Sequence, residues 1–410
     1  MDVEIIRFLL QLSQYLPPEY SAMKILFLTS RFPFPLEKGD KLRAFYQIVE
    51  LSKKHQVILA AVSDVKVLPE HLEALKPYCR RIVVHNIGKA KQIQNLIRAL
   101  FNGKPFQVEY FFSNVFKKKI QKIIQDDKPD AIFCQLVRMA EYVKDEKQIP
   151  VTLDYQDAFS KGYERQVQRE SIFKKIPVMM EWKRMLKYEG NIFNDFKNKI
   201  IISEQDRDYI HHTDNKKIEV IPNGVDFNYY SPVAREKKYD LIFSGNMNYP
   251  PNIESAIYIA EKIMPLLKKK KPDAKLVIAG ANPASEVMKL QNESVEVTGW
   301  VDDIRGPFSE SRIHLAPMLI SIGLQNKILQ AMAMKIPCIV SSQANNAIHA
   351  PTNDCLLIAD TPEQYVEKIL LLLNDQPLYN KIAENACHFV RKNFDWSAMN
   401  EKLEQVLSRK

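Results

Sequence analysis

Short apolar runs alternate along the chain with longer stretches in which apolar residues recur at helical spacing. The first run, MKILFLTS at Met23–Ser30, suits a strand that is buried on both faces. The loop RFPFPLEKGD follows it, and then come the helical pattern KLRAFYQIVELSKK and a second apolar run, HQVILAAVSD. A strand, a helix and a strand at this spacing form a βαβ unit, which predicts a parallel sheet. The alternation continues through the runs RRIVVHNI, AIFCQL, VTLDYQD and NKIIISE.

A second series of the same kind begins after Ile218–Pro232, a segment rich in turn-forming residues. Its apolar runs are DLIFSG, AKLVIAG, VEVTGW, IHLAPM and PCIVSS. We therefore expect an α/β protein with two doubly wound parallel sheets in tandem. The predicted division is an N-terminal extension without an assigned role (1–22), an N-terminal α/β domain (23–217), an interdomain linker (218–236), a C-terminal α/β domain (237–393) and a C-terminal helix returning to the N-terminal domain (394–410).

Composition excludes several classes of protein. Of the 410 residues, 46% are hydrophobic and 26% charged, which is typical of a globular protein. No apolar run has the length of a membrane span, and the first residues lack the pattern of a secretory signal, so we expect a cytoplasmic protein. The five cysteines form no CxxC pair and the histidines no metal-ligand spacing, which indicates buried thiols and no metal site.

The formal charge is +9, with basic blocks at Lys117–Lys119 and Lys268–Lys271. Such blocks either form a solvated face or attract anionic lipid or anionic substrates. No nucleic-acid-binding motif accompanies them, so nucleic acid is not expected as a partner.

Glycines follow several of the predicted strands. In doubly wound sheets, ligands bind outside the carboxyl ends of the strands, which places the loops after these strands around one cleft. A glycine there allows backbone to approach a ligand closely, although ordinary turn chemistry is the alternative. The residues that precede the loops of this cleft are Ser30, Gly245, Gly280, Gly299 and Pro317.

The segment SIGLQNKILQAMAMKIPCIVSS, at Ser321–Ser342, combines a loop that ends at Gly323 with a helical pattern. The free N–H groups of a helix N-terminus suit a phosphate, and Lys327 in the first turn adds a positive charge. Gln330 lies three residues later on the same face, where it can bind a ribose hydroxyl. The alternative is that both side chains only face water.

This segment resembles the donor-binding signature of the retaining glycosyltransferases related to sucrose and glycogen synthases, glycosyltransferase family 4. The segments VIPNGVD, SGNMNYPPN and VTGWVDDIR resemble elements of the same family in the same order. SRFPFPLEKGDKLR looks like a bacterial subgroup that acts in exopolysaccharide assembly. The resemblance implies the GT-B fold, in which two doubly wound parallel-sheet domains face each other across a cleft.

The resemblance also implies an activity. A sugar would pass, with retention and without a metal or other cofactor, from a nucleoside-diphosphate sugar to an acceptor hydroxyl on a polysaccharide or lipid-linked saccharide precursor. Lys327, the helix N–H groups and the backbone of Gly39 would stabilise the leaving diphosphate, and Asp157 would do any acid–base work. The implied donor-binding residues are Gly323, Asn326, Lys327, Gln330, Gly245, Asn246, Gly299, Val301, Arg31 and Asp40.

Some of these assignments have simpler alternatives. Asp154 and Asp157 are expected at the mouth of the cleft, but Asp157 could instead cap the next helix, and Asp40 could be an ordinary acid at a helix N-terminus.

The sequence departs from the family pattern at several positions. Two glutamates separated by seven residues are usual, and here Ile322 and Gln330 stand in their places. Asn246–Asn248 replaces an expected arginine and lysine, Gln156 a histidine, and Lys335 a glycine. A catalytically degenerate protein that binds a sugar nucleotide or a partner is therefore one alternative function. A nucleotide-sugar epimerase or phosphorylase of the same fold is another, whereas no GxGxxG motif supports an oxidoreductase.

The acceptor side is predicted from the stretch between Lys89 and Ile124, which interleaves basic and aromatic residues. One interpretation is peripheral docking on the inner face of an anionic membrane, near a lipid-linked saccharide. The other is that the aromatic residues pack in the core and the basic residues form a solvent-exposed edge.

Overall fold

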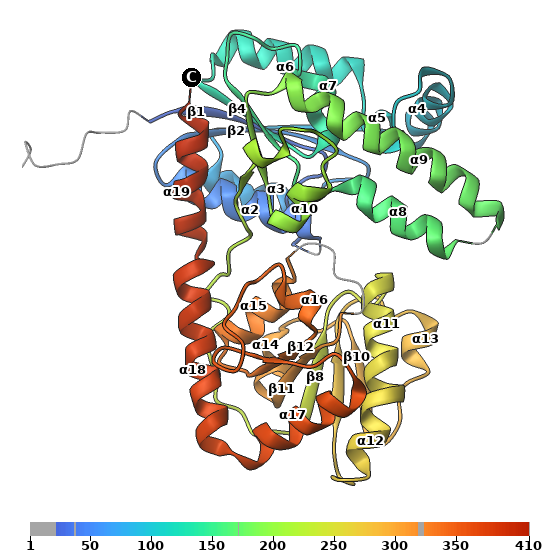
Figure 1. Ribbon diagram of the computed structural model, residues 1–410. Helices are drawn as coiled ribbons and strands as arrows, with labels where there is room; N and C mark the ends of the chain where they lie inside the picture. The colour runs from blue at the N-terminus through green and yellow to red at the C-terminus, as the bar shows by residue number, and fades with distance from the viewer. Residues whose placement is uncertain (1–21, 37, 171, 319–323, 410) are drawn as a thin grey trace, which may run out of the picture.

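The computed structural model describes residues 22–36, 38–170, 172–318 and 324–409, and Figure 1 shows two α/β domains that are stacked one on the other. Residues 1–21 of the predicted N-terminal extension, Ile322 and the candidate Gly323 lie outside the described residues.

The N-terminal domain is built on a seven-stranded sheet with the order β3-β2-β1-β4-β5-β6-β7. All neighbouring strands are parallel. The strands are β1 (Lys24–Thr29), β2 (Gln56–Ser63), β3 (Arg81–Asn86), β4 (Ala131–Gln135), β5 (Val151–Asp154), β6 (Asn198–Ile201) and β7 (Glu219–Val220).

Helices cover both faces of this sheet, as the crossovers between parallel strands require. They are α2 (Gly39–Ser52), α3 (Pro69–Leu75), α4 (Lys89–Asn102), α5 (Phe106–Tyr110), α6 (Asn114–Asp127), α7 (Ala140–Val143), α8 (Phe159–Arg169), α9 (Ile172–Asn191) and α10 (Glu204–Tyr209). Short 3₁₀ turns occur at Lys76–Tyr78, Val137–Met139, Ile192–Asp195 and Asn215–Lys217.

The C-terminal domain repeats this design with a six-stranded parallel sheet, order β10-β9-β8-β11-β12-β13. Its strands are β8 (Tyr239–Ser244), β9 (Leu276–Ala279), β10 (Val295–Gly299), β11 (Ser311–Ala316), β12 (Cys338–Val340) and β13 (Leu357–Ile358). Its helices are α11 (Pro250–Tyr258), α12 (Met264–Lys268), α13 (Ser285–Met288), α14 (Arg305–Ser309), α15 (Asn326–Ala333), α16 (Ser342–Asn345), α17 (Pro362–Asn374) and α18 (Gln376–Asn393), with a π-helical turn at Ile259–Ile263 between α11 and α12. The predicted fold class, two doubly wound parallel sheets, is confirmed.

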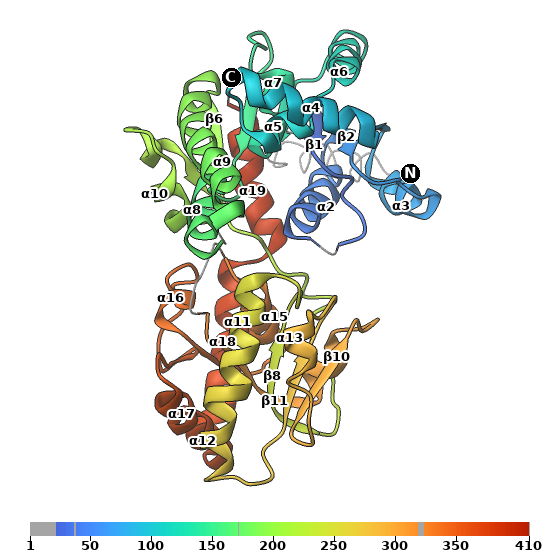
Figure 2. The ribbon, with the colours of Figure 1, turned by 90° about the vertical axis from the view of Figure 1, so that its right-hand side faces the viewer.

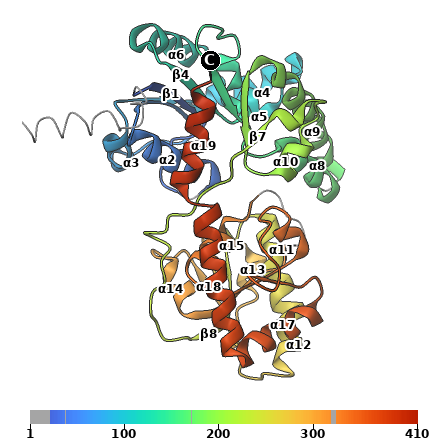
Figure 3. The same ribbon diagram turned by 60° about the vertical axis from the view of Figure 1, so that its left-hand side comes forward.

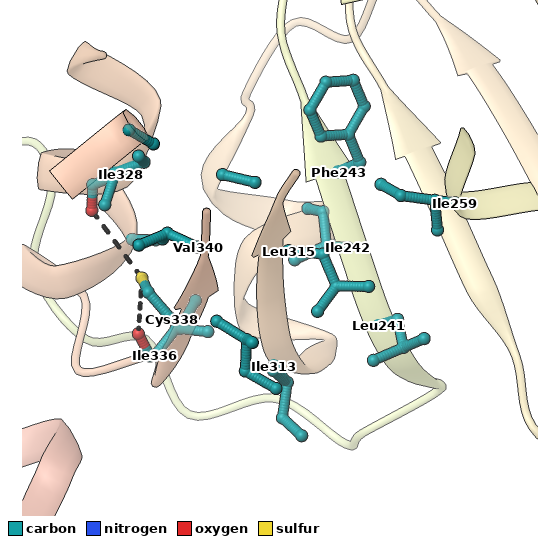
Figure 4. Packing of buried hydrophobic residues seen from close by; sticks show 14 of the residues in the cluster. Leu241, Ile242, Phe243, Ile259, Ile313, Leu315, Ile328, Ile336, Cys338 and Val340 are labelled. Carbon is teal, nitrogen blue, oxygen red and sulfur yellow. Dashed lines mark hydrogen bonds between the residues drawn. The ribbon is translucent and has the colours of Figure 1, made fainter. Parts of the chain in front are cut away.

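Branched aliphatic side chains fill the core of the C-terminal domain because its central strands are buried on both faces. Figure 4 shows Cys338 among them, with its thiol 3.4 Å from the carbonyl oxygen of Ile336 and 3.9 Å from that of Ile328. The five cysteines are all free, and four of them are buried. Among the described residues, no group of three or more acidic, histidine or cysteine side chains has the arrangement of a metal site.

The last helix, α19 (Trp396–Leu407), leaves the C-terminal domain and packs on the N-terminal one. Its residues Met399 and Leu403 share a buried cluster with Ile25 and Phe27 of β1. Figure 3 shows α18 and α19 running one after the other along the same side of both domains. The two domains are thus joined twice, by the linker and by this helix.

Each sheet has one switch point, where the winding of the chain reverses. It lies between β1 and β4 in the N-terminal sheet and between β8 and β11 in the C-terminal sheet. Ligands of such folds bind outside the carboxyl ends of the strands at this point.

Candidate functional site

Three glycines follow neighbouring strands at the carboxyl edge of the C-terminal sheet. The N–H of Gly280 donates to the carbonyl oxygen of Gly299 at 3.2 Å. A Cβ on Gly280 would lie 1.7 Å from the carbonyl oxygen of Gly245, so only glycine fits there. Gly299 has a φ of 67° and open space beside it. At the carboxyl edge of this sheet, the backbone therefore carries no side chains at the three positions where the sequence predicts a ligand-binding loop.

Lys327, in the first turn of α15, points under the loop that follows β8. Its ammonium donates to the side-chain oxygen of Asn252 at 2.6 Å and lies 4.6 Å from the ring centroid of Phe243. The residue is only 9% exposed, and no described acidic side chain lies within 4 Å of the ammonium. Burial lowers the pKa of Lys327 to about 7. An anion at this switch point would therefore meet a cation that lacks a charged partner.

Asn252, on α11, is a site residue that the sequence analysis did not single out. Its side-chain amide donates to the carbonyl oxygen of Asn246 at 2.9 Å while its oxygen accepts from Lys327. It thus fixes both the loop after β8 and the lysine. The available signal was its place at the end of the segment SGNMNYPPN.

Asn326 and Gln330 lie on the side of α15 that faces the linker. Both line a narrow pocket together with Gly224, Asp226 and Trp396. The side-chain oxygen of Asn326 accepts from the amide of Asn223 at 3.4 Å. These two candidates therefore lie where linker and helix meet.

Val301 follows Gly299 at the sheet edge and lines a separate groove along β10, together with Glu296 and Thr298. The structure brings Gly299 close to Gly280 and does not show Val301 next to Lys327.

The N-terminal switch point holds Arg31 and Asp40. The guanidinium of Arg31 donates to the carboxylate of Asp40 at 2.7 Å. Burial opposes ionisation of Asp40, but the positive charges of Arg31, Arg138 and Lys38 outweigh burial and lower the pKa of this carboxyl. Asp40 also lies in the first turn of α2, as its alternative role of an acid at a helix N-terminus predicts, and donor binding by Asp40 stays a prediction.

Gln156 lies between Gly39 and Asp157. A Cβ on Gly39 would lie 4.0 Å from the side-chain nitrogen of Gln156, which is 3.5 Å from the carboxylate of Asp157. Burial, with the charges of Asp206 and Asp154, raises the pKa of Asp157 to about 7 against the opposing charge of Arg43. This pKa suits a group that exchanges protons near neutral pH. The alternative role as a helix cap is not seen: Glu189 accepts from the backbone N–H groups of Phe159 and Ser160 at the start of α8.

The prediction for Asp154 was wrong. Its side chain is fully buried and pairs with the guanidinium of Arg43 at 2.6 Å, rather than standing at the mouth of a cleft. Arg43 also donates to the side-chain oxygen of Asn223 at 2.9 Å. Asp154, the last residue of β5, points into the protein. Through Arg43 it holds Asn223 and thereby anchors the linker.

Comparisons with known proteins concern the family and the fold of the chain. Residues 238–375 match the family described as "Glycosyl transferases group 1". The chain thus carries a glycosyltransferase domain within a two-domain GT-B fold, which supports a transferase activity.

Two curated relatives are similar to the chain over different lengths. The chain is 25% identical over 402 residues to an uncharacterized 44.6 kDa protein in the cps region of Klebsiella pneumoniae, covering 91% of this chain and 96% of that protein. It is 23% identical to an Escherichia coli UDP-Gal:alpha-D-GlcNAc-diphosphoundecaprenol alpha-1,3-galactosyltransferase, over 48% of this chain and 55% of that enzyme.

Among solved structures, Anabaena HepE in complex with UDP-glucose superimposes with a TM-score of 0.68 at 14% identity, covering 94% of this chain and 99% of HepE. The sucrose-phosphate synthase of Thermosynechococcus elongatus gives 0.68 at 14% identity, over 93% and 98% of the two chains. Both likenesses concern the fold. Within the described residues, no helix combines the length and the hydropathy needed to span a membrane.

Proposed function

We propose that this glycosyltransferase moves a sugar from a nucleoside-diphosphate sugar to an acceptor hydroxyl, with retention at the anomeric carbon and without a metal ion. The observation that carries the proposal is Lys327, a buried lysine without an acidic partner among the described residues, below the glycine-lined edge of the C-terminal sheet. The resemblance of Ser321–Ser342 to a donor-binding signature supports this location, and HepE, which has the same fold, was solved in complex with UDP-glucose.

In the proposed reaction, the bond between the anomeric carbon and the β-phosphate oxygen breaks while the acceptor oxygen bonds to the same face of that carbon. Negative charge develops on the leaving nucleoside diphosphate. Preorganised donors stabilise such charge best, and Lys327 together with the backbone at Gly39 and Gly245 would provide them. The acceptor hydroxyl would give its proton to the leaving phosphate or to Asp157.

The first experiment is thermal unfolding of the purified chain with UDP, GDP, ADP and their common sugar conjugates. A ligand that binds only the folded state raises the melting temperature by mass action. We expect one nucleotide to do so, Lys327→Ala to lose the effect, and Lys269→Ala, which removes an exposed lysine of the same domain, to retain it.

Absence of stabilisation by every nucleotide at millimolar concentration would contradict the proposal. It would favour a degenerate protein, in which Ile322 and Gln330 have replaced the glutamates of the family. If a donor sugar is converted without any acceptor, the activity is instead that of an epimerase or a hydrolase.

We also propose that the N-terminal domain docks on an anionic lipid surface through α4. One face of this helix exposes four large apolar side chains, its first turn carries Lys89 and Lys91, and α6 of the same domain exposes further cations. The apolar side chains are Ile93, Ile97, Leu100 and Phe101, and the cations of α6 are Lys118, Lys119 and Lys122. An amphipathic helix with nearby lysines suits the interface of an anionic bilayer.

Phe111 and Phe116 are buried, as the interpretation of a packed aromatic core predicts, whereas Phe101 is 85% exposed and is the aromatic residue on which the docking proposal rests. A lipid-linked saccharide acceptor would explain why a transferase of this kind approaches a membrane.

Sedimentation with vesicles of phosphatidylcholine alone, or mixed with phosphatidylglycerol, tests the docking. We expect binding to the anionic vesicles that weakens with salt, and its loss in Phe101→Glu but not in Leu371→Glu, which alters an exposed leucine of the C-terminal domain. A failure to bind anionic vesicles at low salt, or a dimer in solution that Phe101→Glu dissociates, would overturn the membrane proposal.

A further inference from the structure

Arg138 is a buried cation in the N-terminal domain whose hydrogen-bonding capacity is largely unused. It lies in the 3₁₀ turn directly after β4 and is 9% exposed. Its Nε and Nη1 atoms are buried and have no hydrogen-bond partner among the described residues. The guanidinium carbon lies 5.0 Å from the ring centroid of Phe111 and 4.8 Å from that of Phe159.

Arg31 completes the cluster from the loop after β1. Its guanidinium carbon lies 5.7 Å from the same ring of Phe111, and its Nε is also buried without a described partner. Asp40 accepts from Arg31, and Asp64, which lines the pocket beside Arg31, is a second acid whose charge acts on Arg138. Together with Lys38 and Lys66, the two arginines outnumber these two acids, so the cluster carries an excess of positive charge.

The position of the cluster in the fold points to a ligand. β1 and β4 are neighbours across the switch point of the N-terminal sheet, and both arginines directly follow the carboxyl ends of these strands. The cluster is the counterpart, in this domain, of Lys327 in the other. A pocket of about 190 Å³ opens beside Arg31, and Lys38 and Lys66 line it.

The chemistry of the cluster selects the class of ligand. Unpaired guanidinium N–H groups away from water are unfavourable until an acceptor reaches them. The planar guanidinium presents parallel donors that match the oxygens of a phosphate, and two arginines can hold several oxygens at once. A neutral sugar hydroxyl would leave the excess charge unbalanced.

We propose that Arg31 and Arg138 bind a phosphate or diphosphate group of the acceptor, so that the acceptor is a phosphorylated saccharide. This inference rests on the proposed transferase function and adds the chemical class of its acceptor. The same phosphate chemistry could come from the donor, and the experiment has to separate the two sources. Arg31, predicted as a donor-binding residue, is assigned by this proposal to the acceptor.

The experiment measures binding of inorganic pyrophosphate by calorimetry to the full-length chain saturated with the nucleotide that stabilises it. We expect pyrophosphate to bind the nucleotide-saturated protein. Arg138→Gln should weaken that binding at least about tenfold and change nucleotide affinity by less than about twofold, because one guanidinium carries much of the anion contact. Arg138→Lys retains the positive charge without the parallel N–H donors of the guanidinium, and its pyrophosphate affinity should lie between those of the wild type and Arg138→Gln. Arg80→Gln, which alters an exposed arginine of the same domain, should bind pyrophosphate as the wild type does.

Three outcomes would overturn the inference: no pyrophosphate bound in the presence of nucleotide, loss of nucleotide affinity in Arg138→Gln, or an equal loss of pyrophosphate binding in Arg80→Gln. If Arg138→Gln does not fold, Arg31→Gln carries the same measurement, since this side chain is 21% exposed. If the transferase proposal itself fails, no nucleotide binds the wild type at all, and this result differs from each of the three outcomes above.

Discussion

At the residue scale, the buried charge of Lys327 links donor binding to pH. Burial lowers its pKa to about 7, whereas a bound diphosphate would stabilise the ammonium and raise the pKa again. The free protein therefore releases a proton from this site as the pH rises through 7. Binding of the donor above that pH takes the proton up again.

The affinity for the stabilising nucleotide should accordingly fall above pH 7, by up to about tenfold per pH unit, until the bound lysine itself loses its proton. Calorimetry in buffers of different ionisation enthalpy measures both the affinity and the proton uptake. Lys327→Met should bind weakly and with no such pH dependence. An affinity that stays constant between pH 7 and 9 would show that Lys327 does not contact the phosphates.

A second residue, Lys335, adopts a backbone conformation that favours glycine. Its φ is 57°, at the turn between α15 and β12 where the pattern of the resembling family has a glycine. A side chain in the left-handed region is strained, and the exposed ion pair of Lys335 with Glu384 is a weak compensation.

Lys335→Gly should therefore raise the free energy of unfolding by about 1 kcal/mol. Urea unfolding measures it, and Glu384→Gln, which removes only the ion pair, serves as the control. A loss of stability in Lys335→Gly larger than that in Glu384→Gln would contradict the assignment of strain.

At the scale of elements, α9 caps α8. The carboxylate of Glu189 accepts from the backbone N–H of Phe159 at 2.7 Å, so a helix without a side-chain cap of its own is satisfied from its neighbour. Burial has the largest effect on this carboxyl and raises the pKa of Glu189 to about 7. The hydrogen bonds from the backbone act in the opposite direction.

Because the pKa of Glu189 is higher in the folded than in the unfolded protein, the protonated carboxyl stabilises the fold. This stabilisation is complete below the unfolded pKa and is lost as the pH rises through 7. The contribution of Glu189 is on the order of 3 kcal/mol. Glu189→Gln should flatten the decline in stability between pH 4.5 and about 7, measured by urea unfolding across this range. Glu164→Gln, which removes a half-buried carboxylate of α8 itself, should leave the pH profile unchanged, and an unaltered profile in Glu189→Gln would refute this titration.

At the scale of the whole molecule, the linker is held between the two domains. Tyr46 of α2 stacks on Trp396 with ring centroids 5.2 Å apart and donates to the carboxylate of Asp226 at 3.1 Å. The N–H of Val225 donates to the carbonyl oxygen of Phe394. The two crossings between the domains thus contact each other.

Gly224 is where these crossings are tightest, since a Cβ there would lie 2.6 Å from the ring of Trp396. Gly224→Ala should displace Trp396, cost about 1–3 kcal/mol of stability and change the relative placement of the domains. Urea unfolding and small-angle scattering measure the two effects. Gly88→Ala, with nothing within 4 Å of the added methyl, is the control, and equal behaviour of the two variants would contradict this account.

Much of the fold followed from local patterns. The apolar runs at Met23–Ser30 and DLIFSG became the central strands β1 and β8, because a strand buried on both faces requires consecutive apolar residues. The glycines at 245, 280 and 299 lie together at the sheet edge as predicted. Arg138 was not singled out, since an arginine outside any strong motif gives no local signal, and Asn252 was missed although it ends the segment SGNMNYPPN.

The sequence by itself determined the order of the elements, the two parallel sheets and the class of enzyme, because periodicity, turn residues and the four family-like segments are properties of neighbouring residues. Only the tertiary structure decided which charges are buried and what they face. Asp154 meets Arg43 across 111 positions of the chain, and Lys327 meets Asn252 across 75. Whether a charged side chain is a solvated surface group, a structural pair or a ligand-binding cation depends on such distant contacts, which set its solvation and its partners.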